Sequence, residues 1–532
     1  MKKHLTILYP FLLAVYPVLF LFSHNIGETA YREMWVPLFL VLAGAIVLFF
    51  LLKLFIKDKL KISLILSLLL IFFFSYGYAH EIIKKWEFFS LLARHRYLLI
   101  LWAGSFGLIS YGLTRLKNLS NVVKFFSIFV SALVLMTLIN IASYEIKKPV
   151  IDKNKLFTEK DAVMLSGNLK NKNDLPDIYY LMPDGMANVN AFREAFGFDG
   201  SNFVKELNKK GFQVATNSRS NYPTTGRSLS SALNMDYVNT LSARVGVDVD
   251  NQGDIQKKMI NDNKAMRLLK SQGYQFITFS SGWSLTNYNE NADIQFNGGY
   301  FDEFPRVFAQ TTLLKPFFSG GRSFFAIDAD KEMRKRVLYA FDKLSNEVPK
   351  IEGPKFVFAH IPEPHPPFLF DANGNEVIKE SGDFGDSSDA STIKTFDHLG
   401  YAAAYWDQWL FISKKLDQTV KDIIANSKNP PIIIIQSDHG AYIPEPNNPK
   451  KPDNYPDERA SDKSLRAAVK NFSAYYLPGK SKGILPVNMS PVNTFRLVFD
   501  QYFGTTYGLL ENKSHYHHPN QSSMEIPASR VK

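Results

Sequence analysis

Long apolar runs, separated by short polar connections, dominate the first 145 residues. Each of the five runs is close to the roughly 20 residues that a helix needs to cross a hydrocarbon core. They cover residues 5–23, 35–56, 61–79, 97–114 and 122–142. A single N-terminal run could be a cleaved signal peptide, but four more follow and no small-residue cleavage site is evident. The pattern therefore predicts an N-terminal bundle of five transmembrane helices (residues 1–145) rather than the buried helices of a large soluble core.

The pattern changes after residue 145. Residues 146–175 are polar and lack a sustained apolar period, which is typical of a juxtamembrane linker. In residues 176–532, short β-branched or aromatic runs alternate with longer helical stretches, which predicts an α/β domain with a largely parallel central sheet covered by helices. The expected strands are 178–182, 211–215, 274–280, 355–361, 432–436 and 473–477, and the expected helices are 200–210, 228–236, 262–272, 330–347, 397–427 and 490–503.

Charge is distributed unevenly between these two parts. Residues 1–150 hold 16 Lys and Arg and 6 Asp and Glu, whereas the whole chain holds 61 and 50, so the remainder is nearly neutral. A neutral domain without a long basic stripe argues against nucleic acid as a partner. The chain has no cysteine, which excludes disulfides, thiolate metal ligands, a cysteine nucleophile and a formylglycine made from cysteine.

The basic residues beside the apolar runs predict the orientation in the bilayer. With the N-terminus inside, nine of them lie in cytoplasmic segments and five lie outside. The nine are Lys2, Lys3, Lys53, Lys57, Lys59, Lys61, Arg115, Lys117 and Lys124, and the five are Arg32, Lys84, Lys85, Arg94 and Arg96. Five crossings then place everything after residue 145 outside the cytoplasm. Within the outer segment 80–96, Trp86, Phe88 and Phe89 predict an amphipathic helix at the level of the lipid headgroups.

Two segments place metal-binding side chains directly after an expected strand. Asp184 follows the strand 178–182, and the pair Asp438-His439 follows the strand 432–436. Either segment can be a simple turn closed by glycine. Ligands, however, bind at the carboxyl edge of an open α/β sheet, and carboxylate together with imidazole suits Zn²⁺ or Mn²⁺ better than Ca²⁺. A metal site at this edge is therefore one of two interpretations.

A third segment, residues 220–234, gathers hydroxyl groups just ahead of an expected helix. One interpretation is that these hydroxyls serve simply as a helix N-cap. The same geometry also directs free N–H groups and positive potential at an anion, and a threonine oxygen there, with Arg227 close by, could face a phosphate.

Together these segments resemble the alkaline phosphatase superfamily, in particular its membrane-anchored sulfatase-like branch of lipoteichoic acid synthase, phosphoglycerol transferases and phosphoethanolamine transferases. The resemblance covers most of residues 176–515, and the preceding helical bundle fits the same layout. Two further segments match in the expected order, namely AHIPEPHPPF at 359–368 and SPVNTFR at 490–496.

The resemblance implies a role for each matching residue. One divalent metal ion, Zn or Mn, would be bound by Asp184, Thr225, Asp438 and His439. Thr225, rather than its neighbour Thr224, would be the nucleophile, because the family places it three residues before the Ser-Leu of the helix.

Substrate contacts are implied in the same way. His360 and His365 would contact the substrate phosphate or the leaving group, and Arg227 would stabilise charge on the phosphate oxygens. The alternative for the two histidines is a strand-end and loop pair without a ligand. His515, His517 and His518 could approach the site, but we expect a solvated tail.

The sequence also departs from the family. Asp184 precedes Gly185, where many relatives carry a carboxylate pair or a Glu. The chain lacks the Asp-x-x-x-His spacing that holds a second ion in two-metal relatives, so one metal is favoured. It also lacks the C/S-x-P/A-x-R motif that is converted to formylglycine, which argues against sulfatase activity.

The expected function is a transferase that moves a phospholipid-headgroup phosphate ester, phosphoglycerol or phosphoethanolamine, through a phosphothreonine intermediate. The partners are a phospholipid donor, a cell-envelope glycan or lipid acceptor, and the lipid bilayer. The expected location is the bacterial cytoplasmic (inner) membrane, with the catalytic domain on the extracytoplasmic side. A phosphodiesterase or phosphatase of the same fold, and a catalytically silent envelope-assembly protein, remain alternatives.

Overall fold

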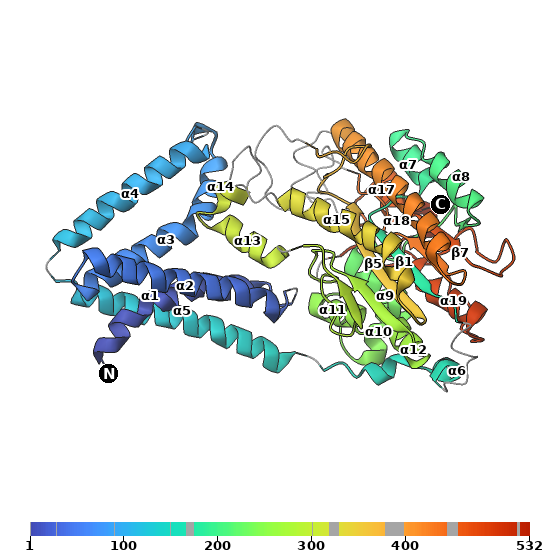
Figure 1. Ribbon diagram of the computed structural model, residues 1–532, viewed down its shortest axis with the longest axis horizontal. Coiled ribbons are helices and arrows are strands. Elements are labelled where there is room, and N and C mark those ends of the chain that lie inside the picture. Colours follow the sequence, from blue (N-terminus) through green and yellow to red (C-terminus); the bar gives the residue numbers. More distant parts are fainter. Residues whose placement is uncertain are drawn as a thin grey trace. The chain divides into compact units, whose positions relative to one another are not determined.

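A computed structural model describes most of the chain, which folds into two units (Figure 1). The described residues of Met1–Pro149 and Phe301–Ala329 form one unit, and those of Val150–Tyr300, Asp330–Glu380 and Asp386–Lys532 form the other. The described residues are 2–27, 29–89, 91–116, 118–148, 150–165, 175–299, 302–318, 329–377, 398–443, 456–518 and 522–531.

The apolar runs of the first unit all fold as helices. They are α1 (Lys2–His24), α2 (Tyr31–Phe55), α3 (Lys59–Lys84), α4 (His95–Arg115) and α5 (Ser120–Lys147). In the described residues, four of them, α2 to α5, are long and apolar enough to cross a membrane, whereas the apolar part of α1, Leu8–His24, is shorter. Length and composition therefore support four spans and leave the predicted fifth unconfirmed. Within the described part of the segment 80–96, the expected amphipathic helix is only a short 3-10 turn, Glu87–Phe89.

A later segment of the chain also packs into this first unit. Its helices are α13 (Glu303–Thr311) and α14 (Lys315–Phe318). Phe304 and Phe308 are buried in the same hydrophobic cluster as residues of α1, α2 and α3. A Cβ added at Gly77 of α3 would lie 2.2 Å from the carbonyl oxygen of Gln310, so the close approach of the two helices requires glycine at this position. Sequence patterning had assigned these residues to the domain 176–532.

The second unit is built on a seven-stranded sheet in the order β2-β7-β6-β1-β5-β3-β4. β1, β3, β4, β5 and β6 run parallel to one another, whereas β7 is antiparallel to both β6 and β2. The bounds are β1 (Ile178–Asp184), β2 (Gln213–Val214), β3 (Gln275–Phe279), β4 (Ile294–Phe296), β5 (Lys355–Pro364), β6 (Ile432–Gln436) and β7 (Ser473–Tyr476). The largely parallel sheet is confirmed. β4, which is only three residues long, was not predicted.

Helices cover both faces of this sheet. Tyr179 and Leu181 of β1 point into one hydrophobic cluster, and Tyr180 and Met182 point into another, as alternation along a strand requires. The first face is covered by α7 (Val189–Phe196), α8 (Ser201–Lys209), α15 (Ala329–Asn346) and α17 (His398–Asn426), and the second by α9 (Thr225–Asn234), α12 (Lys264–Ser271) and α19 (Thr494–Tyr502). The other helices of this unit are α6 (Ala162–Leu165), α10 (Val238–Val245), α11 (Gly253–Asn261) and α18 (Asp462–Val469). The central strands are therefore buried on both sides, and their chemistry lies at their ends.

Candidate metal centre and nucleophile

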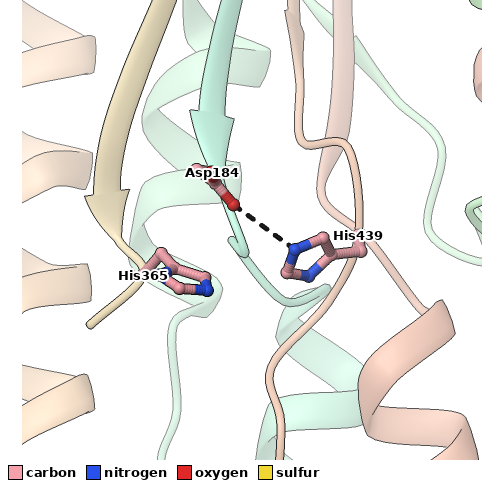
Figure 2. A group of neighbouring side chains, drawn as sticks. All are labelled: Asp184, His365 and His439. Atoms are coloured by element: carbon pink, nitrogen blue, oxygen red, sulfur yellow. Dashed lines mark ion pairs between the residues drawn. The ribbon is translucent and has the colours of Figure 1, made fainter. Parts of the chain in front are cut away.

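Three neighbouring parallel strands bring the predicted metal-binding residues to one edge of the sheet. Asp184 is the last residue of β1, and Asp438 and His439 directly follow β6. β5 pairs with the other side of β1 and leads to His365. Figure 2 shows Asp184, His365 and His439 turned toward one another. Their ligand atoms all lie within 4.8 Å of one another, and they are the one such group of His, Asp and Glu found among the described residues.

His439 lies between the two aspartates. Its Nε2 atom is 3.4 Å from Asp184 Oδ1 and 3.4 Å from Asp438 Oδ2. These two carboxylate oxygens are buried, and within the described residues neither has a hydrogen-bond donor. Buried polar atoms in folded proteins are almost always paired. Two such oxygens beside one imidazole nitrogen therefore indicate a missing positive partner.

The protonation of the two histidines supports this interpretation. Nδ1 of His439 lies 2.7 Å from the carbonyl oxygen of Gly440, and Nδ1 of His365 lies 2.7 Å from that of Pro366. A carbonyl can only accept, so Nδ1 carries the proton in both rings, and in the neutral ring Nε2 presents a lone pair. Metal-bound histidines are usually oriented in this way by an outer carbonyl. The donor set of carboxylate oxygens and imidazole nitrogens fits a divalent cation such as Zn²⁺ or Mn²⁺.

The electrostatics of Asp184 suit the same role. Burial alone would raise the pKa of its carboxyl group. The neighbouring imidazoles, that of His365 first, outweigh burial and lower the pKa of Asp184 to about 2. Asp184 is therefore an anion at neutral pH, as a metal ligand must be.

The backbone at position 185, next to Asp184, favours glycine. Its φ is +64°, a conformation that residues other than glycine rarely adopt, and both His365 and His439 lie at van der Waals distance from an added Cβ. Its N–H donates to Asp438 Oδ1 over 3.0 Å. Tyr405 on α17 in turn donates its hydroxyl proton to the Gly185 carbonyl over 2.7 Å. Gly185 thus holds the outer oxygen of Asp438 and leaves Oδ2 facing His439.

The predicted nucleophile Thr225 is the first residue of α9, and Thr224 occupies the N-cap. Ser228, one turn further on, donates its hydroxyl proton to the carbonyl oxygen of Asp438 over 2.6 Å. The hydroxyl of Tyr442, whose ring stacks on that of His439, donates to the carbonyl of Pro223. Two hydrogen bonds therefore tie the start of α9 to the loop that carries Asp438 and His439. Free N–H groups and positive potential at this helix start favour a bound anion.

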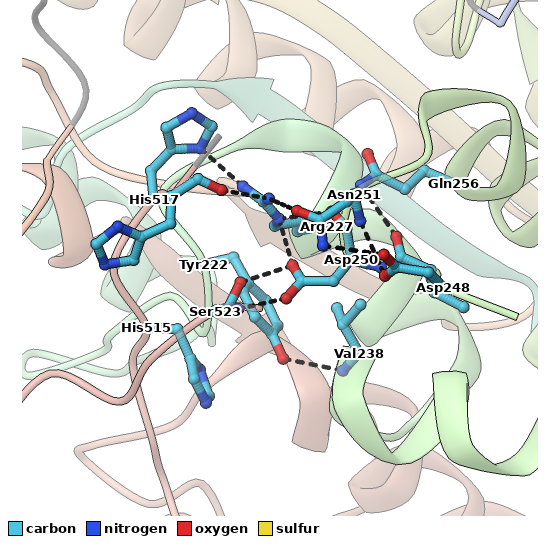
Figure 3. Close-up of polar contacts among 12 residues, drawn as sticks. Tyr222, Arg227, Val238, Asp248, Asp250, Asn251, Gln256, His515, His517 and Ser523 are labelled. Atoms are coloured by element: carbon cyan, nitrogen blue, oxygen red, sulfur yellow. Dashed lines mark hydrogen bonds and ion pairs between the residues drawn. The ribbon is translucent and has the colours of Figure 1, made fainter. Parts of the chain in front are cut away.

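Arg227 lies in a second buried polar network (Figure 3). Its Nε atom is 2.5 Å from Asp250 Oδ1, and both side chains are almost fully buried. Its Nη1 atom donates to His517 Nδ1 over 2.7 Å. The described contacts of Arg227 are therefore with protein groups, and its predicted contact with a substrate phosphate remains a prediction.

The C-terminal histidines correct an expectation. His515 and His518 are buried, so the predicted solvated tail is wrong for the described residues 514–518. The ring of His515 stacks on that of Tyr222 at a centroid distance of 4.8 Å. Aromatic stacking and the hydrogen bond from Arg227 draw this segment onto the turn that precedes Thr225. The local sequence of residues 514–518 does not reveal that Tyr222 and Arg227, almost 300 residues earlier in the chain, are their partners.

His360 is buried on β5, and its Nε2 lies 3.1 Å from Asp184 Oδ2. The opposite nitrogen, Nδ1, lies 2.6 Å from the hydroxyl of Thr286. Sequence reasoning did not identify Thr286, Tyr405 or Tyr442 as parts of the site. Thr286 and Tyr405 reach it from a loop and a helix far away in the sequence, and only the pairing of strands shows which segments meet. Tyr442 lies three residues after His439, but its hydrogen-bond partner Pro223 is distant in the sequence.

The chain is similar to one family of known proteins and to several solved structures. Residues 181–465, more than half of the chain, match the family model described as Sulfatase. Among solved structures, the chain is similar to the C-terminal periplasmic domain of EcEptC from Escherichia coli, at 14% identity and a TM-score of 0.43, over 68% of this chain and 94% of that one.

Two further solved structures are similar to this chain. One is the C-terminal periplasmic domain of phosphoethanolamine transferase EptC from Campylobacter jejuni, at 12% identity and a TM-score of 0.37, over 63% of this chain and 92% of that one. The other is the phosphonate monoester hydrolase of Agrobacterium radiobacter, at 10% identity and a TM-score of 0.38, over 62% and 74%. No curated protein matches the sequence.

Proposed function

Because this chain belongs to the sulfatase family, we propose that it is a metal-dependent phosphotransferase that works through a phosphothreonine intermediate. It would move a phospholipid-headgroup phosphate ester, phosphoglycerol or phosphoethanolamine, onto a cell-envelope glycan or lipid. One observation carries the proposal: two buried carboxylate oxygens, for which the described residues supply no donor, flank the Nε2 atom of His439, next to a helix start that bears a threonine. The lack of a formylglycine motif argues against sulfate esters as substrates.

The residues that would hold the metal are Asp184, Asp438 and His439, with Thr225 completing the set. When bound, a divalent ion supplies positive charge that favours the threonine alkoxide and the anionic phosphate. The chain itself supplies the geometry. Ser228 and Tyr442 hold the start of α9 against the loop of Asp438, so that Thr225 is oriented by its own helix rather than by a mobile loop.

In the first step, the Thr225 oxygen attacks the phosphorus of the donor diester. A new bond from Thr225 to phosphorus forms as the bond to the leaving alcohol breaks. The proton lost by Thr225 is passed to the leaving oxygen, and His365 is the residue proposed to carry it, because its Nε2 faces the site while Nδ1 is held by Pro366. In the second step, an acceptor hydroxyl displaces the phosphate ester and regenerates Thr225.

The membrane helices support the choice of donor. A catalytic unit tethered by apolar helices at the outer face of the bacterial cytoplasmic membrane would have continuous access to lipid headgroups, while ATP is absent there. This location rests on the Lys and Arg bias of the loops and on five crossings, four of which length and composition support in the described residues. Phospholipid is therefore the proposed donor.

Transferase and hydrolase can be separated with the purified full-length chain, loaded with Zn²⁺ or Mn²⁺, in vesicles of phospholipid labelled in the headgroup phosphate. The proposal expects label on Thr225 and its transfer to an added glycan or lipid acceptor, with little release to water. Rapid release of free headgroup phosphate without an acceptor would show a phosphodiesterase. Metal-loaded protein that takes up no label would support the silent alternative.

A further inference from the structure

Both ring nitrogens of His360 are engaged by protein groups. Its side chain is buried, and the ring of Trp283 meets it edge to face at a centroid distance of 5.7 Å. Nε2 faces Asp184 Oδ2 at 3.1 Å, and Nδ1 faces the hydroxyl oxygen of Thr286 at 2.6 Å. This arrangement differs from that of His365 and His439, whose Nδ1 atoms face backbone carbonyls.

The direction of these hydrogen bonds follows from Asp184. An ionised carboxylate can only accept, so His360 Nε2 must carry the proton that it donates to Oδ2. In the neutral ring Nδ1 is then an acceptor, and the donor is the Thr286 hydroxyl. Ser281 lies 2.8 Å from the Thr286 oxygen and can donate to it, while the oxygen of Ser281 accepts from the N–H of Trp283 over 3.0 Å. The Ser281 hydroxyl can also donate to the carbonyl oxygen of Trp283 over 3.2 Å. The protons of His360 and Thr286, in contrast, have one place each in this chain of bonds.

The rest of the loop is fixed around this chain. Asn287 Oδ1 accepts from the N–H of Gly282 over 3.0 Å. Arg336 on α15 reaches the same oxygen over 3.3 Å. The loop that presents Ser281 and Thr286 is thus braced by a buried side chain from a long helix.

We propose that Thr286 is a positioning residue that sets the tautomer of His360, so that His360 holds Asp184 Oδ2 and turns Asp184 Oδ1 toward the metal. The inference rests on the proposed metal-dependent function. It assigns His360 to the orientation of the metal ligand Asp184 and leaves His365 as the residue that contacts the substrate. Loss of the Thr286 hydroxyl removes the donor to Nδ1, which frees the imidazole to reverse its tautomer and withdraw its proton from Asp184.

The test is Thr286→Val, which keeps the shape of the side chain and removes its hydroxyl, compared with Thr286→Ser, which keeps the hydroxyl. The full-length chain in detergent is stripped of metal and titrated with Zn²⁺ against a competing chelator, without any lipid donor. An outer hydrogen bond to a metal site is typically worth about 10- to 100-fold in affinity. We expect a loss of that size for Thr286→Val and an affinity within about threefold of the parent for Thr286→Ser.

A matched control is Thr278→Val on β3. Thr278 is buried like Thr286, but within the described residues its hydroxyl has no hydrogen-bond partner. This variant should bind Zn²⁺ as the parent does. Equal affinities for the parent and Thr286→Val, with both proteins folded by circular dichroism, would overturn the inference, and so would a Thr286→Ser variant as weak as Thr286→Val.

Failure of this inference is distinguishable from failure of the proposed function. A parent protein that binds no Zn²⁺ at saturating concentrations contradicts both. A parent that binds Zn²⁺ tightly and independently of Thr286 contradicts the inference alone. A parent that binds Zn²⁺ in a Thr286-dependent way, yet never labels Thr225 with lipid phosphate, contradicts the proposed transfer alone.

Discussion

Two buried aspartates in the same unit, Asp184 and Asp250, differ in how their oxygens are satisfied. Asp250 Oδ1 accepts from Arg227 and from the Ser523 hydroxyl over 2.5 and 2.6 Å, and Oδ2 accepts from the Ser523 N–H. Asp184 Oδ1, within the described residues, has no donor at all. A buried charge is tolerated only when it is paired. The paired carboxylate therefore stabilises the fold, and the other needs a cation from outside the chain.

This contrast predicts that substitutions in the two regions have different effects. Substitutions around Asp184 should remove metal or chemistry and leave the fold. Substitutions around Asp250 should destabilise the fold and leave the metal ligands in place. The predictions below test that division, beginning with the largest effect.

Thr225→Ala removes the proposed nucleophile at the start of α9. Loss of a nucleophile that acts together with its partners typically removes most catalysis, so transfer should fall by at least about a thousandfold. Zn²⁺ should still bind through Asp184, Asp438 and His439. Intact-protein mass spectrometry should then show no phosphate ester on the variant, and a Thr224→Ala variant should still form the adduct. An adduct on Thr225→Ala would assign the nucleophile to another residue.

Asp438→Asn removes a charged ligand and keeps the size of the side chain. We expect the affinity for Zn²⁺ to fall by more than the about 10- to 100-fold that an outer hydrogen bond contributes. Elemental analysis of the purified variant measures this loss directly. Undiminished metal content in well-folded protein would mean that the carboxylate oxygens beside His439 do not bind the ion.

Asp250→Asn leaves Arg227 as a buried cation without its partner. Breaking one side of a buried ion pair costs about 3–5 kcal/mol, so the midpoint of chemical denaturation should drop clearly. At a temperature where the variant is folded, its affinity for Zn²⁺ should match that of the parent. A variant that keeps its stability but loses metal would reverse the roles assigned to the two regions.

His517 gives the smallest effect, a dependence of stability on pH. Burial first, and the charge of Arg227 second, lower the pKa of His517 to about 4 from its usual 6.5. Because the unfolded chain takes up this proton below pH 6.5 and the folded chain does not, His517 makes the protein less stable as the pH falls from about 6.5 to about 4. His517→Gln should flatten that part of the profile of melting temperature against pH. An unchanged slope would show that His517 does not titrate in this way.

The sequence predicted the fold well where the apolar pattern of a strand or helix can be recognised without knowing its neighbours. The apolar run 432–435 lies within β6. A central parallel strand is buried on both faces, so its apolar run can be recognised whichever strands pair with it. β4 is too short to show a pattern. Nothing in the sequence of α13 reveals that Phe304 and Phe308 pack with residues of α1, α2 and α3 rather than on the sheet.

The candidate site shows the same limit. Asp184, Asp438 and His439 could be predicted because each lies at or just after the carboxyl end of a strand, and parallel neighbours end at one edge. The roles of Gly185, Thr286 and Tyr405 depend on hydrogen bonds between segments that are far apart in sequence. Arg227 was predicted to face phosphate from its place beside Thr225, but its closest described partner is a carboxylate. Proximity in sequence does not reveal which way a long side chain turns.

The most direct test of the metal centre is anomalous diffraction from crystals of the protein grown with Zn²⁺, measured on both sides of the zinc absorption edge. The account predicts one strong peak about 2.0–2.2 Å from His439 Nε2 and from carboxylate oxygens of Asp184 and Asp438. A peak at Asp250 and His517 instead, or no peak at saturating Zn²⁺, would contradict it.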